Sequence, residues 1–294
     1  MPIRALLAIA LIPAAYAQSP VQRLLADKML YGRIKALDDS LNGVLGVAAI
    51  DLNSGAMFAY NGDAVFPTAS SIKVAILIEM FRQIKAGAFR LSYSVTLTPA
   101  ESVGGSGEFQ NALKRGPFNV TVQQLITEMI EHSDNTATNR CIAMVKMENV
   151  NRFLEEHGFH ATRLRRMMMD AAAAERGDEN VSTPVEMTRL LQMLYDGRAV
   201  DAESSRQMLE IMKRVKAAIR GAIPPEIPVA SKPGDLDGVR CETGIVYLPG
   251  RTFAISVFST FLDEAANPVG DATKIVFDYF RKLAAANEYG RKIR

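Results

Sequence analysis

Apolar residues recur at three- and four-residue steps over much of the chain, and runs of β-branched and aromatic residues lie near both ends. The stepped pattern over residues 21–41 predicts an amphipathic helix. Residues 44–52 and 56–61 are β-branched and aromatic, and Asn53-Ser54-Gly55 between them provides hairpin turn chemistry. A sheet is therefore expected to begin directly after the first helix.

The middle of the chain is predicted to be helical. Residues 71–85 lack Gly and Pro and place Val74, Leu77, Ile78 and Phe81 on one stripe, which indicates a buried helix. Further helical periodicity covers residues 121–132, 136–145, 150–157, 183–195 and 202–215, and Thr183-Pro184 is a favourable helix start.

Strand patterns return near the carboxyl end, at residues 229–232, 241–248 and 252–260, and a last helix is predicted over 272–285. This order predicts an α/β fold whose antiparallel sheet is built from both chain ends, with a helical subdomain inserted between sheet strands. We expect one domain over residues 18–294, with the α/β part at about 21–66 and 220–294 and the helical part at about 67–219. A substrate site is expected in the groove between the two parts.

The first residues have the pattern of a signal peptide. Arg4 precedes an apolar run of about 11 residues, which is shorter than the roughly 20 that a spanning helix needs, and Ala15-Tyr16-Ala17 resembles a cleavage site. We therefore expect cleavage after Ala17 and a periplasmic or secreted protein without a membrane anchor.

The charge, the cysteines and the histidines bear on which partners and metals the protein could bind. The formal net charge is +2, and charges of both signs are interspersed, so no nucleic-acid partner is implied. Cys141 and Cys241 are the only cysteines, and either a disulfide or two buried thiols fits them. The three histidines lack metal-ligand spacing, and no metal is expected.

Gly104 to Gly107 are expected to form a flexible loop at the cleft edge.

The sequence Ser70-Ser71-Ile72-Lys73 offers nucleophilic chemistry. Residues three apart in a helix share a face, so the Lys73 amine can reach the Ser70 hydroxyl. Burial and a second cation nearby would lower the pKa of the lysine and allow it to act as a base. The backbone N–H of Ser70 at a helix start could stabilise an oxyanion. This spacing alone is weak, because it arises about once by chance in a chain of this length.

Two further motifs strengthen this interpretation, namely Ser133-Asp134-Asn135 between two predicted helices and Lys232-Pro233-Gly234 before a hairpin. In order and spacing the three motifs resemble those of class A β-lactamases and related penicillin-recognising serine hydrolases. The resemblance runs from about residue 24 to residue 285.

This resemblance implies a β-lactamase/transpeptidase-like fold and a role for each motif residue. Ser70 would be the nucleophile, Lys73 its proton partner, and Ser133 a proton relay between Lys73, Lys232 and the leaving group. Asn135 would hold the substrate's acyl amide, Lys232 would supply positive charge, and the backbone N–H of Asp235 would complete the oxyanion hole. Pro233 and Gly234 would line the substrate site. No cofactor, a small-molecule substrate and a monomeric state are implied.

The chain departs from the family pattern in the loop that precedes Thr183-Pro184. Class A enzymes carry there a glutamate that activates the deacylating water, and the matching position falls on Met168 or a neighbouring methionine. A thioether accepts no proton. Asp170 is the candidate water-activating residue, with Glu175 as a further option. Asp170 could instead have a structural role, such as pairing with Arg165 or Arg166.

A second departure concerns the substrate carboxylate. Pro233 replaces a residue whose hydroxyl helps bind that carboxylate in the family, and Asp235 adds negative charge to the same pocket. Arg240, Ser231 or Thr243 could compensate.

The resemblance therefore predicts β-lactam hydrolysis through an acyl-enzyme at Ser70, with slow deacylation. Within the enzymes, the alternative is an esterase, D-amino-acid amidase or carboxypeptidase. The alternative of another class is a penicillin-binding or sensing protein that stays acylated.

Overall fold

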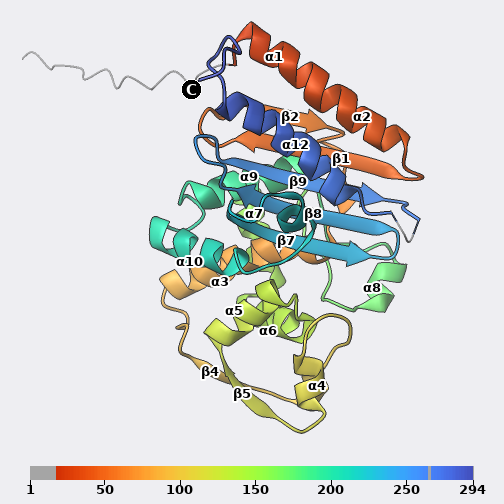
Figure 1. The fold of residues 1–294 in the computed structure, drawn as a ribbon. Helices are drawn as coiled ribbons and strands as arrows, with labels where there is room; N and C mark the ends of the chain where they lie inside the picture. The colour runs from red at the N-terminus through yellow and green to blue at the C-terminus, as the bar shows by residue number, and fades with distance from the viewer. Residues whose placement is uncertain (1–17, 264–265, 294) are drawn as a thin grey trace, which may run out of the picture.

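A computed structural model describes residues 18–263 and 266–293 of the protein (Figure 1). The predicted signal peptide, residues 1–17, lies outside the described residues. Over the ranges that are described, no helix has both the length and the apolar character needed to cross a membrane.

The predicted sheet is present, with strands from both ends of the chain. Its five strands are antiparallel and follow the order β2-β1-β9-β8-β7, so β7 is an edge strand. The strands are β1 (Val44–Asp51), β2 (Met57–Tyr60), β7 (Val229–Leu236), β8 (Val239–Val246) and β9 (Phe253–Thr260). Whereas residues 229–232 were expected to form the first of the late strands, β7 continues through Pro233 to Leu236. An edge strand tolerates a proline because one of its sides needs no ladder hydrogen bond.

Helices cover both faces of this sheet (Figure 1). On one face lie α1 (Pro20–Ala26), the short π-helical turn Asp27–Tyr31, α2 (Gly32–Asp39) and α12 (Pro268–Ala284). On the other face, α9 (Pro184–Tyr195) packs against β1 and β9. The apolar core divides accordingly into two clusters, one between the sheet and the terminal helices and one around α3 and α9.

The helical part surrounds α3 (Lys73–Lys85), whose residues Lys73 to Phe81 are all buried. Its neighbours are α5 (Val122–Glu131), α6 (Asn135–Val145), α7 (Met147–Glu156) and α10 (Ala202–Met212). These helices agree with the sequence periodicity to within a few residues. A 3₁₀ turn, Ala69–Ile72, precedes α3 and contains Ser70.

Several short elements were not predicted. They are the paired strands β3 (Phe66–Pro67) and β6 (Val181–Ser182), the hairpin of β4 (Ser94–Leu97) and β5 (Phe118–Thr121), the 3₁₀ turn Pro99–Glu101, and the helices α4 (Phe109–Leu113), α8 (Ala171–Glu175) and α11 (Ala218–Ala222). Strands of two to four residues carry too little periodicity to be recognised before their partners are known.

The two cysteines are free thiols in the structure, and both are buried. Of the two alternatives that the sequence left open, the structure therefore has the buried thiols. The division into an α/β part and a helical part by residue range stays a prediction.

Candidate active site

Ser70 lies half-buried in the 3₁₀ turn between β3 and α3. Ala69 before it has φ +44°, a left-handed conformation that costs a non-glycine residue about 1–2 kcal/mol. The turn is held from both sides of this residue. Thr68 donates its backbone N–H to the Asn180 carbonyl at 2.8 Å, and the Ser71 hydroxyl donates to the Thr68 carbonyl at 2.8 Å. The surrounding contacts thus fix the backbone that presents Ser70.

Lys73 is fully buried at the start of α3. Its amine donates to the Ser133 carbonyl at 2.7 Å and to Asn135 Oδ1 at 2.9 Å, and it lies 3.1 Å from Ser133 Oγ. Within the described residues, its hydrogen bonds go to these two residues and not to the Ser70 hydroxyl. The first and second motifs are therefore joined through Lys73.

Ser133 joins the second motif to the third. It occupies the turn between α5 and α6 with φ +55°, and its hydroxyl accepts a hydrogen bond from Lys232 Nζ at 2.9 Å. Lys232 also donates to the Pro233 carbonyl at 3.1 Å and is fully buried. One hydroxyl thus lies between two buried amines.

Burial changes the acidity of both amines. The pKa of Lys73 is held well below its usual 10.5, first by desolvation and second by the charge of Lys232. Desolvation lowers the pKa of Lys232 to about 8. Both shifts favour the neutral amine, and at pH 7 Lys232, with a pKa of about 8, retains most of its charge.

Asp134 fixes the loop at the cleft edge. Its carboxylate caps α6 through the Ala137 N–H at 2.7 Å and accepts from the Phe109 N–H at 2.8 Å. A Cβ at Gly107, whose φ is +99°, would lie 2.1 Å from this carboxylate, so only glycine fits there. Asn135 adds bonds from its side-chain amide to the Gly104 carbonyl and from its N–H to the Ser106 carbonyl. The loop lies at the cleft edge as expected, but these hydrogen bonds pin it.

On the sheet side, β7 passes close to the nucleophile turn. A Cβ at Gly234 would stand 2.9 Å from the Ser70 nitrogen and 2.5 Å from the Thr68 carbonyl, so this approach requires glycine. Cys241 on β8 supports the same turn by donating its thiol to the Thr68 carbonyl at 3.0 Å. Asp235 follows Gly234 with a largely exposed side chain.

The three residues considered as compensation for Pro233 have partners of their own. Arg240 forms an ion pair with Asp235 at 3.0 Å. The Ser231 hydroxyl donates to the buried Glu242 carboxylate at 2.6 Å, and the Thr243 hydroxyl lies 2.7 Å from that of Ser256. Ser231 and Thr243 are both fully buried.

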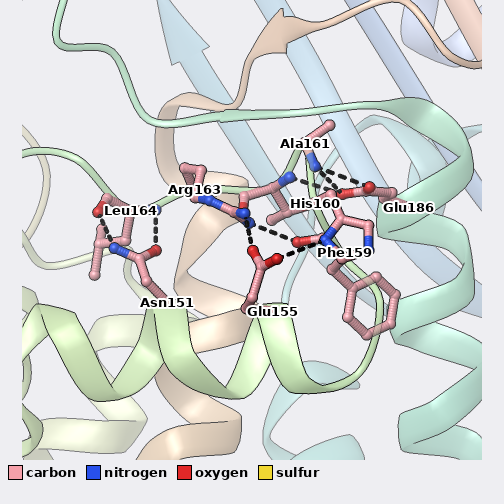
Figure 2. Close-up of polar contacts among 9 residues, drawn as sticks. Asn151, Glu155, Phe159, His160, Ala161, Arg163, Leu164 and Glu186 are labelled. Carbon is pink, nitrogen blue, oxygen red and sulfur yellow. Dashed lines mark hydrogen bonds and ion pairs between the residues drawn. The ribbon is translucent and has the colours of Figure 1, made fainter.

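The methionine-containing loop is anchored where it leaves α7 (Figure 2). Asn151 exchanges two hydrogen bonds with the backbone of Leu164, at 2.8 and 2.9 Å. Glu155 pairs with Arg163 and accepts from His160, and Glu186 on α9 accepts from the N–H groups of Ala161 and Thr162 (Figure 2). Of the three arginines at positions 163, 165 and 166, Arg163 is thus paired within this part of the loop.

The far end of the loop is anchored by Asn180. Its side chain accepts from the N–H groups of Arg165 and Arg166, and its carbonyl accepts from Thr68 beside the nucleophile. Arg166 pairs with Glu179 at 2.9 Å, so Asp170 is not its partner. These contacts join the loop directly to the Ser70 turn.

Two hydrogen bonds with Asn139 fix the methionine loop at Met168. Asn139 on α6 accepts from the Met168 N–H at 2.8 Å and donates to the Met168 carbonyl at 3.1 Å. Met168 is buried, whereas Met169 is 54% exposed with φ +62°. Asp170 Oδ1 caps α8 through the Ala173 N–H at 3.0 Å, and Glu175 is exposed at the end of that helix. Asp170 thus has a structural bond in addition to its place beside the site.

A cavity of about 300 Å³ opens beside Ser70. Its walls come from the nucleophile turn, the 104–107 loop, α6, the methionine loop and β7. The lining residues are Ala69, Ser70, Gly105, Ser106, Asn135, Arg166, Met168, Met169, Asp170, Ala171, Ala174, Asn180, Asp235 and Leu236. A larger depression of about 650 Å³ around His157 and Arg189 lies away from these motifs. Across residues 18–263 and 266–293, no group of three or more His, Cys, Asp or Glu side chains is arranged to hold a metal ion.

Sequence reasoning did not identify Asn180, Asn151 or Cys241 as supports of this site. Each acts through contacts made across more than ten residues of sequence, and no local motif marks them. Asn139 lies in the segment that follows the Ser133 motif, but its bond to Met168 depends on the path of the loop.

The chain matches known proteins over most of its length. A family model described as the Beta-lactamase enzyme family matches residues 29–280. The structure of a beta-lactamase from Sphaerobacter thermophilus is 26% identical with a TM-score of 0.77, covering 88% of this chain and 97% of the other. An ancestral class A beta-lactamase is 25% identical with a TM-score of 0.78, covering 85% and 99%.

The fold is also similar to that of PBP-A. A mutant of PBP-A, described as an acyl-enzyme complex with penicillin G, is 24% identical with a TM-score of 0.79 and covers 89% of this chain and 97% of the other. The match of the family model over residues 29–280 shows that the chain belongs to the beta-lactamase enzyme family.

Proposed function

We propose that the protein is a serine hydrolase that β-lactams acylate at Ser70 and that releases the acyl group slowly. The observation that carries this proposal is the placement of one hydroxyl, that of Ser133, between the buried amines of Lys73 and Lys232, beside a cavity that Ser70 lines. A hydroxyl between two amines whose pKa values are both lowered by burial is suited to passing a proton between them.

The hydrogen bonds of Lys73 suit a neutral amine. A neutral amine has two N–H donors and one lone pair, and two of its contacts are to acceptors that cannot donate, the Ser133 carbonyl and Asn135 Oδ1. Its lone pair is then available for a hydroxyl proton. We propose that Lys73 takes the Ser70 proton as Ser70 attacks the carbonyl, and that Ser133 delivers a proton to the leaving nitrogen.

The developing oxyanion needs donors at the turn. Gly234 brings β7 against the Ser70 nitrogen, and we propose that the N–H groups of Ser70 and Asp235 stabilise the oxyanion together. Asn135, which lines the cavity, would hold the acyl amide, and the charge of Lys232 would attract the substrate carboxylate.

Release of the acyl group is the step that lacks a clear base. The resemblance puts Met168 or a neighbouring methionine where the family has its glutamate; Met168 and Met169 both line the cavity, and a thioether accepts no proton. Asp170 lines the same cavity and stays the candidate base, although one of its oxygens caps α8. We therefore propose that deacylation limits turnover.

The test is burst kinetics with a chromogenic cephalosporin. We expect one equivalent of product in a rapid phase and then slow turnover, and we expect no burst from Ser70→Ala. Met168→Glu or Met169→Glu should raise the slow rate about tenfold or more, and Met168→Gln, which has no carboxylate, is the matched control. Linear progress curves from the wild type, or no gain from glutamate at either position, would contradict slow release.

The same Met168 position favours a second candidate, a penicillin-binding or sensing protein that acylates once. Burst kinetics separate the two, because a receptor gives the burst and no later turnover. An esterase, D-amino-acid amidase or carboxypeptidase would instead turn over a p-nitrophenyl ester or a D-amino-acid peptide faster than the cephalosporin. We further propose that the mature protein is an exported monomer that begins after Ala17.

A further inference from the structure

The cavity beside Ser70 carries a carboxylate on each side and an apolar surface between them. Asp170 lies on the loop side and Asp235 on the sheet side, while Met168, Met169 and Leu236 supply the apolar surface. Side chains of this kind suit a ligand with an apolar body and a positive charge.

The cation that lines this cavity is already paired. Arg166 directs both Nε and Nη2 to Glu179, at 3.2 and 2.9 Å, and its Nη1 to the Met167 carbonyl. The two site lysines, Lys73 and Lys232, are fully buried on the Ser133 side and are not among the lining residues. The lining therefore offers an incoming ligand negative charge.

Both carboxylates can still accept hydrogen bonds from such a ligand. Asp170 uses Oδ1 to cap α8, and within the described residues Oδ2 has no hydrogen bond or ion pair. Asp235 forms an ion pair with Arg240 at 3.0 Å, but its side chain is 70% exposed at the cavity edge. A carboxylate oxygen accepts more than one hydrogen bond, so both groups can receive an ammonium.

We propose that this cavity selects acyl groups that carry a protonated amine on an apolar body. This inference rests on the proposed acylation of Ser70. The resemblance placed Asp235 beside the substrate carboxylate, but in the structure Asp235 lines the cavity together with Asn135, whereas Lys232 does not. In the proposed pose the acyl side of the substrate therefore faces Asp170 and Asp235, and its carboxylate faces Lys232. The preferred substrate is thus a zwitterion whose two charges lie on opposite sides of the reacting carbonyl.

Two penicillins that differ by a single amine test this selectivity. Ampicillin carries an α-amino group that benzylpenicillin lacks, and the amine is protonated at pH 6. We would measure second-order rate constants for acylation of Ser70 by competition with a fluorescent penicillin. Partly exposed ion pairs support a preference for ampicillin of about fivefold, which should fall as salt is added and as pH rises through the pKa of the amine.

Charge-removing variants locate the effect. Asp170→Asn and Asp235→Asn should each reduce the ampicillin preference about twofold, and the double variant should abolish it. Asp237→Asn, on the same hairpin, removes an exposed carboxylate that does not line the cavity and should leave the preference unchanged.

The outcomes separate this inference from the function on which it rests. Equal acylation by the two penicillins, a preference for benzylpenicillin, or a preference that survives the double variant would overturn the selectivity while leaving Ser70 acylation intact. Failure of both penicillins to label Ser70 would overturn the proposed function, and the selectivity with it.

Discussion

At the scale of single residues, Lys232 determines how the site responds to pH. Its pKa of about 8 means that the ammonium is lost as pH rises above that value. Acylation by a carboxylate-bearing β-lactam should therefore fall up to about tenfold per pH unit above pH 8, because an anionic substrate loses its charge partner. Rate–pH profiles check this, with an uncharged ester as control. If the acylation rates of both substrates fall equally above pH 8, the fall comes from proton transfer and not from the substrate carboxylate.

Pro233 is the residue at which the carboxylate site can be tested by substitution. Threonine restores a hydroxyl on an edge strand whose ladder tolerates either residue, and one added hydrogen bond is worth about 1 kcal/mol. Pro233→Thr should lower the apparent Kd of carboxylate-bearing substrates about fivefold, measured from the concentration dependence of acylation. Unchanged affinity would mean that the carboxylate binds elsewhere.

At the scale of elements, the methionine loop depends on Asn180 for its position. The Asn180 side chain is buried and bonds to the N–H groups of Arg165 and Arg166 and to the Arg166 carbonyl. Asn180→Ala leaves these groups without that partner, so the free energy of unfolding should fall by about 1–3 kcal/mol in urea denaturation. Asn111→Ala removes an exposed asparagine bond and should change it by less than about 0.5 kcal/mol. An equal change in the free energy of unfolding for the two variants would show that other contacts hold the loop.

The same elements show how far sequence reasoning reached. Long periodic segments such as α3 and α5 and the strands β1 and β9 were predicted, because apolar spacing reports which face is buried. Residues of the three motifs meet around Ser133, and the catalytic roles that the resemblance implied for them stay predictions. The loop contacts of Asn139 and Asn180 could not be predicted, because they depend on the tertiary path of a segment without periodicity.

At the scale of the whole molecule, the buried site lysines lower the stability of the fold. Lys232 has a pKa of about 8 in the folded protein against an ordinary 10.5, which corresponds to about 3 kcal/mol of unfavourable burial below pH 8. Between pH 8 and 10.5 the unfolded chain binds more protons, so this residue makes stability rise with pH in that window. Lys232→Met should unfold at a higher temperature than the wild type at pH 7, and its stability should rise less with pH, because only the buried Lys73 still contributes to that rise.

Thermal unfolding of Lys232→Met and of the wild type at pH 7 and pH 9.5 measures the unfolding temperature and its change with pH. Asp134 and Ser133 are retained in the variant, and Lys73 still bonds to Ser133, so that hydroxyl keeps a partner. Lys282→Met, on the last turn of α12, is the control for losing an exposed charge. A destabilised Lys232→Met protein would mean that the bonds of Lys232 to Ser133 and Pro233 outweigh its desolvation.

Slow release requires that the acyl-enzyme at Ser70 last far longer than it takes to form. Time-resolved intact mass of the protein mixed with penicillin G and with a cephalosporin tests it most directly, with Ser70→Ala as the control. We expect an adduct of one acyl group that appears within seconds, persists far longer than it took to form, and is absent from Ser70→Ala. An adduct on Ser70→Ala, or product formation without any accumulated adduct in the wild type, would contradict it.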